Sequence, residues 1–131
     1  MAIIGIGTDR VVIARIASSV ERFGDRFVRR VYTETEITQA KAKGNLARRL
    51  AMLFAAKEAA SKALGTGFRQ GIALRDIETI HLASGKPEIT LHAAAASVAS
   101  ALGVEKVHLS LTDDDGIAMA FAIAECSDRQ A

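Results

Sequence analysis

Hydrophobic and polar positions at the start of the chain follow first a strand pattern and then a helical one. Residues 2–6 are apolar and rich in isoleucine, and they predict a strand that ends near Thr8-Asp9. From residue 13 the apolar positions recur at helical spacing, and Gly24 is a typical stop. We therefore expect one strand followed by one helix.

Two further helices are predicted in the middle of the chain. Thr33 followed by Glu36 forms a capping-box pattern, which predicts a short helix that runs to Gly44. The longest helical pattern spans residues 45–64, with an asparagine cap in front of it and a glycine stop behind it.

The second half of the chain predicts strands and one more helix. We expect the strands at residues 77–82, 88–91, 106–112 and 117–124, and the helix over residues 93–102. Asp115-Gly116 is a typical two-residue hairpin turn. Because helices and strands alternate without a regular βαβ rhythm, the fold class expected for residues 1–131 is a single α+β domain. Its antiparallel sheet would pack with one long helix and shorter helices.

Composition and charge narrow the function classes. Half of the 131 residues are apolar, which is enough for a hydrophobic core and argues against a disordered chain. The net charge of +2 is too small to indicate a nucleic-acid partner, but basic residues gather between Arg10 and Arg49. Such a cationic face suits an acidic macromolecule or phosphates.

The number of cysteines and the length of the apolar runs indicate the cellular compartment. Cys126 is the only cysteine, so an internal disulfide is excluded. No apolar run has the length of a membrane span, and the histidines lack the spacing of zinc ligands. We expect a cytoplasmic protein without a membrane or nucleic-acid partner and without a zinc site.

Candidate chemistry begins with a carboxylate behind the first strand. The segment from Gly5 to Asp9 starts like a dinucleotide-binding motif, but Arg10 stands where the third glycine is required. Taken alone, Asp9 is explained most simply as an Asx turn or a helix cap.

The long helix carries polar residues on an apolar line. Every fourth residue from Leu46 to Phe54 is apolar, and the line continues into Glu58 and Lys62, with Ser61 beside them. An exposed Glu–Lys pair explains this arrangement as well as a functional site does.

A metal site is the functional alternative. Mg²⁺ prefers oxygen ligands and often takes one or two carboxylates together with substrate phosphates. Asp9 and Glu58 could supply these carboxylates if the fold brings them together, and Lys62 could then neutralise phosphate charge.

The strand predicted over residues 106–112 has an apolar face and a hydrogen-bonding face, which carries His108, Ser110 and Thr112. A half-exposed strand is the simplest explanation. The aspartates that follow it lack the later glutamate of an EF-hand loop, so a hairpin turn explains them better.

Four segments of the chain resemble, in the same order, the motifs of the holo-acyl-carrier-protein synthases, the AcpS-type 4′-phosphopantetheinyl transferases. The first joins Gly5-Ile6-Gly7-Thr8-Asp9 to Ala14-Arg15-Ile16 and is similar to the family's G-x-G-T-D…R-I motif. Residues 54–67 are similar to its F-A-A-K-E-A-x-x-K-A-x-G-T-G signature. Gly85-Lys86-Pro87 matches its G-K-P turn, and residues 108–113 match its H-x-S-x-S/T segment.

The resemblance implies the family's fold and reaction. The enzyme would transfer 4′-phosphopantetheine from coenzyme A to a serine of apo-acyl carrier protein and release adenosine 3′,5′-bisphosphate, a step that serves fatty acid biosynthesis. The implied catalytic residues are Asp9, Glu58 and Lys62. The first two would hold Mg²⁺, and Glu58 would also help to deprotonate the serine. Implied coenzyme A contacts are Arg48, Ser61, Lys62, Gly85, Lys86, Pro87, Ser110 and Thr112.

Partners follow from the same resemblance. Arg15, Arg22 and Arg26 fall on or beside the first helix, where this family docks its acidic carrier protein. The family implies a homotrimer whose sites lie between subunits. One subunit would supply the Asp9 region and its neighbour the Glu58 helix, or the reverse.

Some positions depart from the family's common pattern. The family commonly has isoleucine, glutamate, arginine and histidine where this chain has Arg10, Val12, Leu53 and Asp113, although aspartate is also familiar at the last position. If the family's arginine contacts a phosphate of coenzyme A, Leu53 should weaken affinity, and Arg48 or Arg49 would compensate.

Two alternatives stay open. One is a binding module that keeps the fold and holds coenzyme A or the carrier protein without transfer, which the departures at Val12 and Leu53 motivate. The other is a small nucleic-acid-binding domain built on the arginine-rich first third, although this segment lacks interleaved aromatic residues.

Overall fold

The computed structural model describes residues 1–126, which form a three-stranded sheet, a separate hairpin and helices packed against them. The elements are β1 (Ala2–Val12), α1 (Ile13–Phe23), α2 (Asp25–Val31), α3 (Glu34–Ala42), α4 (Leu46–Ala63), the 3₁₀ turn η1 (Leu74–Asp76), β2 (Ile77–His81), β3 (Pro87–Leu91), α5 (Ala93–Leu102), β4 (Val104–Asp114) and β5 (Ile117–Cys126).

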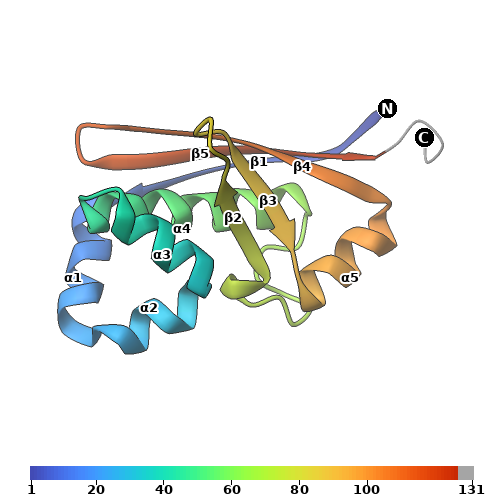
Figure 1. Ribbon diagram of the computed structural model, residues 1–131. Coiled ribbons are helices and arrows are strands. Elements are labelled where there is room, and N and C mark those ends of the chain that lie inside the picture. Colours follow the sequence, from blue (N-terminus) through green and yellow to red (C-terminus); the bar gives the residue numbers. More distant parts are fainter. Residues whose placement is uncertain (127–131) are drawn as a thin grey trace.

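The three-stranded sheet is antiparallel and has the order β1-β5-β4, so β1 and β4 are its two outer strands. Asp115 and Gly116 join β4 to β5 with positive φ angles, as a two-residue hairpin turn requires. All five α-helices lie on one side of this sheet (Figure 1). The expected α+β class and antiparallel sheet are thereby confirmed.

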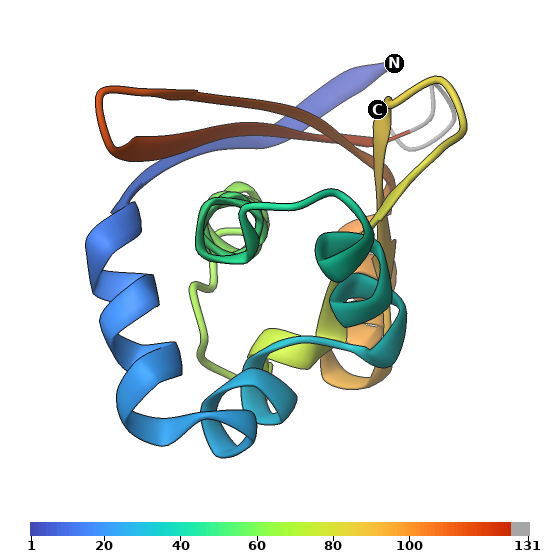
Figure 2. The same cartoon turned by 60° about the vertical axis from the view of Figure 1, so that its left-hand side comes forward.

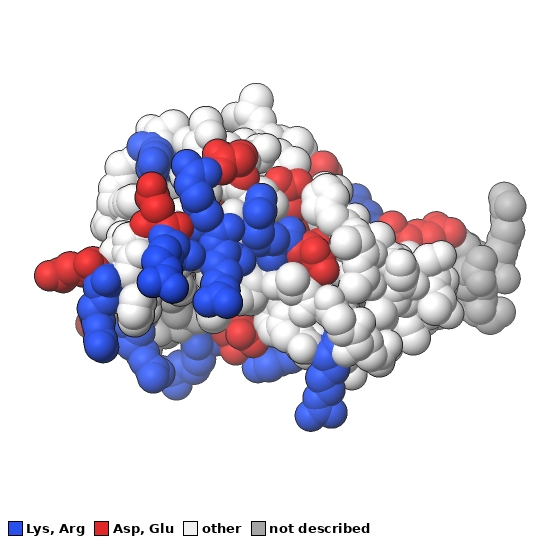
Figure 3. Space-filling model, turned by 90° about the horizontal axis from the view of Figure 1, so that it is seen from below, with Lys and Arg blue, Asp and Glu red and all other residues white. Residues whose placement is uncertain are grey.

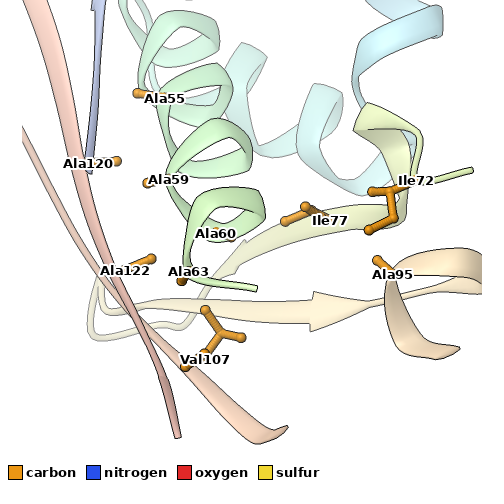
Figure 4. Packing of buried hydrophobic residues seen from close by; sticks show 11 residues of the cluster. Ala55, Ala59, Ala60, Ala63, Ile72, Ile77, Ala95, Val107, Ala120 and Ala122 are labelled. Atoms are coloured by element: carbon orange, nitrogen blue, oxygen red, sulfur yellow. The ribbon is translucent and has the colours of Figure 1, made fainter. Parts of the chain in front are cut away.

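Helix α4 packs closely against the inner face of the sheet because both surfaces consist largely of alanine. Ala55, Ala59 and Ala63 of the helix face Ala120 and Ala122 of β5 in the main core (Figure 4). Small side chains allow the helix axis to approach the strands, so the helix packs at a short distance from the sheet.

The remaining helices build a second core around the first half of α4. Figure 2, in which α4 is seen nearly end-on, shows α1, α2 and α3 following one another around it. Their buried residues meet Leu50 and Leu53 of α4, and the Tyr32 hydroxyl donates a hydrogen bond of 2.7 Å to the carbonyl oxygen of Leu50.

Local signals at the helix ends are confirmed. The Thr33 side chain and Glu36 form the expected capping box, and Asn45 accepts a hydrogen bond from the Arg48 amide at the start of α4. Gly103 ends α5 in the left-handed conformation.

Helix α2 and the length of the strands were not predicted. Gly24, with φ of 53°, ends α1 but also starts the seven-residue α2, which is too short to show a clear apolar period. Strand β1 continues to Val12 because β5 pairs with it as far as Ile117.

Candidate active site

Asp9 and Lys62 meet at one outer edge of the sheet. Asp9 lies on β1 and Lys62 near the carboxyl end of α4, and the Lys62 Nζ is 3.1 Å from the Asp9 carboxylate. The same ammonium donates a hydrogen bond of 3.0 Å to the carbonyl oxygen of Thr8. The Lys62 side chain is half exposed, so it can reach a ligand in solvent as well as Asp9.

Glu58 lies one helical turn before Lys62 and shares the same surface. Burial and the neighbouring Asp9 carboxylate raise the pKa of Glu58, and the Lys62 ammonium offsets part of this increase. Asp9 and Glu58 therefore concentrate negative charge at one spot, as the sequence predicts if these residues act together.

This donor set fits Mg²⁺. Carboxylate oxygens are suitable ligands, and a cation beside Asp9 and Glu58 would relieve the repulsion between the two carboxylates, which adds to the larger effect of burial in raising the pKa of Glu58. Within residues 1–126 no cluster of three or more His, Cys, Asp or Glu side chains could hold a metal ion. A cation at Asp9 and Glu58 would therefore need further oxygen ligands, such as those of a substrate phosphate and water.

Gly5 and Gly7 explain how β1 reaches α4. A Cβ atom on Gly5 would lie 2.1 Å from the carbonyl oxygen of Ala63, and one on Gly7 would lie 2.0 Å from that of Ala59. The strand and the helix thus touch backbone to backbone, two residues before Asp9 and one turn from Lys62. The paired glycines serve this close packing, not the cradling of a phosphate.

Ser61 is not brought into the open part of the site. Its side chain is buried, and its hydroxyl donates a hydrogen bond of 2.7 Å to the carbonyl oxygen of Glu58 within the helix. The expected contact between Ser61 and coenzyme A stays a prediction.

The Gly85-Lys86-Pro87 turn lies on the opposite side of the molecule from Asp9. It joins β2 to β3, and β3 packs beside β4, whereas Asp9 belongs to β1 at the other edge of the sheet. Ser110 and Thr112 are exposed on the sheet face that points away from α4.

This arrangement corrects one expectation. The division of the site between an Asp9 subunit and a Glu58 subunit is wrong, because β1 and α4 of a single chain bring these residues together. Within one chain, the Asp9 and Glu58 carboxylates lie far from the Gly85-Lys86-Pro87 turn.

Arg48 binds Asp113, one of the residues that differ from the family's common pattern. Its Nε and Nη2 donate hydrogen bonds of 2.9 and 2.6 Å to the two oxygens of Asp113, which joins the start of α4 to the end of β4. The Arg48 hydrogen bond lowers the pKa of Asp113. Arg48 therefore has only its remaining N–H groups to offer to a phosphate.

A cavity that the sequence did not predict lies between the hairpin, α3, α4 and β4. This hairpin pocket has a volume of about 130 Å³ and is lined by Gln39, Ala40, Ala42, Lys43, Arg49, Met52, Leu53, His81, Leu82 and Leu111. Its lining combines apolar side chains with Lys43, Arg49 and His81, and it includes no carboxylate. The Nε of Arg49 is buried without a hydrogen-bond partner.

The pocket suits an apolar ring that carries an anionic group. Burial lowers the pKa of His81, and the positive charges of Arg49 and Lys43 beside it lower this pKa further. Leu53 and Arg49, which lies one turn earlier on the same helix, both line the pocket.

The predicted docking arginines are exposed. Arg15 and Arg22 lie two turns apart on α1, and Arg26 follows on α2. Arg29 and Arg30 extend this basic surface along α2, and Figure 3 shows Lys and Arg side chains gathered over this side of the molecule. Arg29 and Arg30 belong to the basic stretch between Arg10 and Arg49, but they were not among the predicted docking residues.

Among the described residues, the helices are either too short or too polar to cross a membrane. Cys126 is buried as a free thiol at the end of β5.

Comparison with known proteins identifies relatives that span nearly the whole chain. A sequence model of the 4′-phosphopantetheinyl transferase superfamily matches residues 5–122. A holo-[acyl-carrier-protein] synthase of Halorhodospira halophila is 50% identical over 121 residues, which cover 92% of this chain and 96% of that protein.

Solved structures show the same fold. The holo-[acyl-carrier-protein] synthase of Neisseria meningitidis matches with a TM-score of 0.87 and 39% identity, over 95% of this chain and 99% of that one. The Helicobacter pylori holo-[acyl-carrier-protein] synthase, solved in complex with coenzyme A, matches with a TM-score of 0.81 and 32% identity, over 92% and 99% of the two chains. This chain therefore belongs to the 4′-phosphopantetheinyl transferase superfamily.

Proposed function

We propose that this protein is a holo-[acyl-carrier-protein] synthase, which transfers 4′-phosphopantetheine from coenzyme A to a serine of apo-acyl carrier protein. The observation that carries the proposal is the meeting of Asp9, Glu58 and Lys62 on one surface of a single chain. The relatives named above support it over nearly the full chain length.

Each side chain has a defined task in this reaction. Asp9 and Glu58 would hold Mg²⁺, which would bind the pyrophosphate of coenzyme A and neutralise part of its charge. Lys62 offsets the charge on the phosphoryl oxygens. Glu58, directly or through a water, accepts the serine proton as the serine oxygen bonds to the β-phosphorus. The bond to the bridging oxygen then breaks, and adenosine 3′,5′-bisphosphate leaves.

The hairpin pocket is the best place for the adenosine end of coenzyme A. Its apolar walls would hold the base, and Arg49 and Lys43 would hold phosphate. Because the pocket and the carboxylates lie on different sides of one chain, a complete cleft needs the pocket of a second copy. Gly85, Lys86 and Pro87 would border this cleft.

The outer face of the sheet provides the surface for such an assembly. Apolar side chains there are exposed instead of covered, including Ile6, Val12, Met119 and Phe121 with exposed fractions of 60%, 41%, 46% and 40%. On this face the exposed apolar side chains are interspersed with polar ones such as Thr8, Ser110 and Thr112, and such a mixed apolar surface is typical of a protein–protein interface. It supports a homotrimer with one coenzyme A cleft between each pair of neighbours.

The arginines of α1 and α2 would dock the acidic carrier protein. Arg15, Arg22 and Arg26 are exposed on the same basic surface, so they can steer and hold a negatively charged partner. The product, holo-acyl carrier protein, would serve fatty acid biosynthesis in the cytoplasm.

Intact-mass spectrometry tests the proposal directly. Purified protein is incubated with apo-acyl carrier protein, coenzyme A and Mg²⁺, and parallel samples contain EDTA or the variants Asp9→Ala and Glu58→Ala. We expect a phosphopantetheine adduct on the carrier serine that is lost in every control. Binding of coenzyme A by well-folded protein without any adduct would favour the alternative, a binding module with the same fold.

A further inference from the structure

The outer edge of β2 is paired with side chains instead of a neighbouring strand. Lys57 Nζ donates a hydrogen bond of 2.6 Å to the carbonyl oxygen of Ile77, and Glu36 Oε2 accepts one of 2.9 Å from the Thr79 amide. Gln39 accepts a bond of 3.0 Å from the His81 amide and donates one of 3.1 Å to its carbonyl oxygen. We call Glu36, Gln39 and Lys57 the side-chain ladder.

The ladder contains a fully buried ion pair. The Lys57 Nζ is 2.7 Å from Glu36 Oε1, and both side chains are completely inaccessible to solvent. The ammonium donates a third bond, of 3.0 Å, to the carbonyl oxygen of Leu74. Removal of either partner would leave a buried charge unpaired, so the pair strongly constrains where α3, α4 and β2 lie.

The ladder matters because the hairpin is small. A two-stranded hairpin has little stability of its own, and β2–β3 contributes only five residues from each strand. Bonds at every second residue of β2, from Ile77 to His81, hold this hairpin in register with α3 and α4. His81 and Leu82, at the end of the ladder, form one wall of the hairpin pocket.

We propose that Glu36, Gln39 and Lys57 are positioning residues for coenzyme A. They fix the position of the hairpin relative to α3 and α4, and so place the His81–Leu82 wall of the pocket and the Gly85–Pro87 turn where the coenzyme binds. The inference rests on the proposed function of the pocket. It assigns a task to Lys57, the residue beside Glu58 in the long signature, that is separate from the chemistry of Glu58.

The carboxylate side of the chain has its own contact with α4, separate from the ladder. Asp9, Glu58 and Lys62 are set by the backbone contact of Gly5 and Gly7 with α4 on the opposite side of the helix. A weakened ladder should therefore change the KM for coenzyme A and leave kcat nearly unchanged. A purely structural role would lower the melting temperature or the active fraction without a change in KM.

The first test compares Gln39→Ala with Thr38→Ala, its exposed neighbour on α3. Coenzyme A is varied at saturating carrier and Mg²⁺, well below the melting temperature. We expect Gln39→Ala to raise the KM for coenzyme A on the order of tenfold, while kcat changes less than about twofold and Thr38→Ala has no effect. A wild-type KM, or a loss confined to kcat, would overturn the proposal.

Because Gln39 itself lines the pocket, Lys57→Met supplies the second test. Lys57 does not line the pocket, so a similar rise in KM at unchanged kcat would act through the position of the hairpin and not through a lost contact with the ligand. If the Lys57 variant does not fold, hydrogen exchange of the hairpin amides in Gln39→Ala, measured without substrate, still tests the ladder. Faster exchange at His81 and Leu82 in Gln39→Ala supports the ladder, and unchanged exchange contradicts it. Hydrogen exchange tests the ladder even if the wild-type protein shows no transfer. A lack of transfer would contradict only the proposed function.

Discussion

The Cα of Gly7 lies against the carbonyl oxygen of Ala59, so close that a Cβ atom on Gly7 would be 2.0 Å from that oxygen. This backbone contact sets the distance between β1 and α4. Asp9 lies two residues further along β1, and Glu58 directly precedes Ala59. The geometry of the candidate site thus depends on a position that carries no functional group.

Gly7→Ala should therefore be strongly destabilising. The overlap is with backbone, which cannot move aside as a flexible side chain would, so we expect a loss of at least about 2–3 kcal/mol in the free energy of unfolding. Chemical denaturation measures this loss, with Thr8→Ala as the exposed neighbouring control. A Gly7→Ala protein as stable as the control would show that β1 and α4 are not in contact.

Glu58→Gln should abolish transfer and stabilise the metal-free protein at neutral pH. Burial and Asp9 raise the pKa of Glu58 in the folded state, so its charged form costs stability as pH rises through this raised pKa. The cost is absent below the ordinary carboxyl pKa, where Glu58 is protonated in both states.

Thermal melts in EDTA across this pH range measure the effect. The melting temperature of Glu58→Gln should exceed that of wild type at neutral pH, and the difference should disappear on acidification. A difference that grows on acidification would contradict the assigned direction of the pKa shift.

Arg48 and Asp113 should be coupled in stability. Their bidentate contact joins α4 to β4, so a double-mutant cycle of Arg48→Met and Asp113→Asn should give a favourable coupling energy. Strictly additive effects of the two substitutions would show that the pair contributes nothing.

Phe121→Glu should disrupt the oligomer and the activity together. Phe121 lies near the centre of the apolar outer face of the sheet, opposite Thr8 and Ser110 on the neighbouring strands. A buried, unpaired carboxylate at an interface is costly, so light scattering should report a smaller species. Asp114→Lys, at an exposed position beside the β4–β5 turn, is the control. A Phe121→Glu protein with unchanged mass and activity would exclude this face as the interface.

Arg49→Met should weaken coenzyme A binding without removing the chemistry. A hydrogen bond to a charged group contributes about 1.5–3 kcal/mol, so the KM for coenzyme A should rise by roughly 10- to 100-fold at a similar kcat. Exposed Arg69, which does not line the hairpin pocket, provides the matched control Arg69→Met. Equal KM values for both variants would exclude Arg49 from the coenzyme A site.

Local signals in the sequence predicted much of the fold. The capping box at Thr33, the glycine after α5 and the Asp115-Gly116 turn are each determined by one or two residues, and all are confirmed. Helix α2 was missed because Gly24 both ends one helix and starts the next, and nothing in seven residues distinguishes these cases.

Long-range relationships were harder to predict. The apolar line from Leu46 to Phe54 indicated the core face of α4. The close contact with the sheet is made instead by Ala55, Ala59 and Ala63. Their small size is informative only when the glycines of β1 are known to lie beside them. The hairpin pocket was missed because its walls come from four separate elements. The burial of Lys57 was not predicted, since no pattern in one sequence shows that Glu36 lies across from it.

The central claim is that the carboxylates of one chain act with the hairpin pocket of its neighbour, and complementation tests it most directly. Glu58→Ala chains and Arg49→Glu chains are co-expressed with different tags and assayed at a coenzyme A concentration below the wild-type KM, where we expect little transfer from either variant alone, and the mixed oligomers are isolated through both tags. We predict that transfer activity returns, because some interfaces pair an intact carboxylate side with an intact pocket. Mixed oligomers as inactive as either variant alone would contradict the claim and place the whole cleft within one chain.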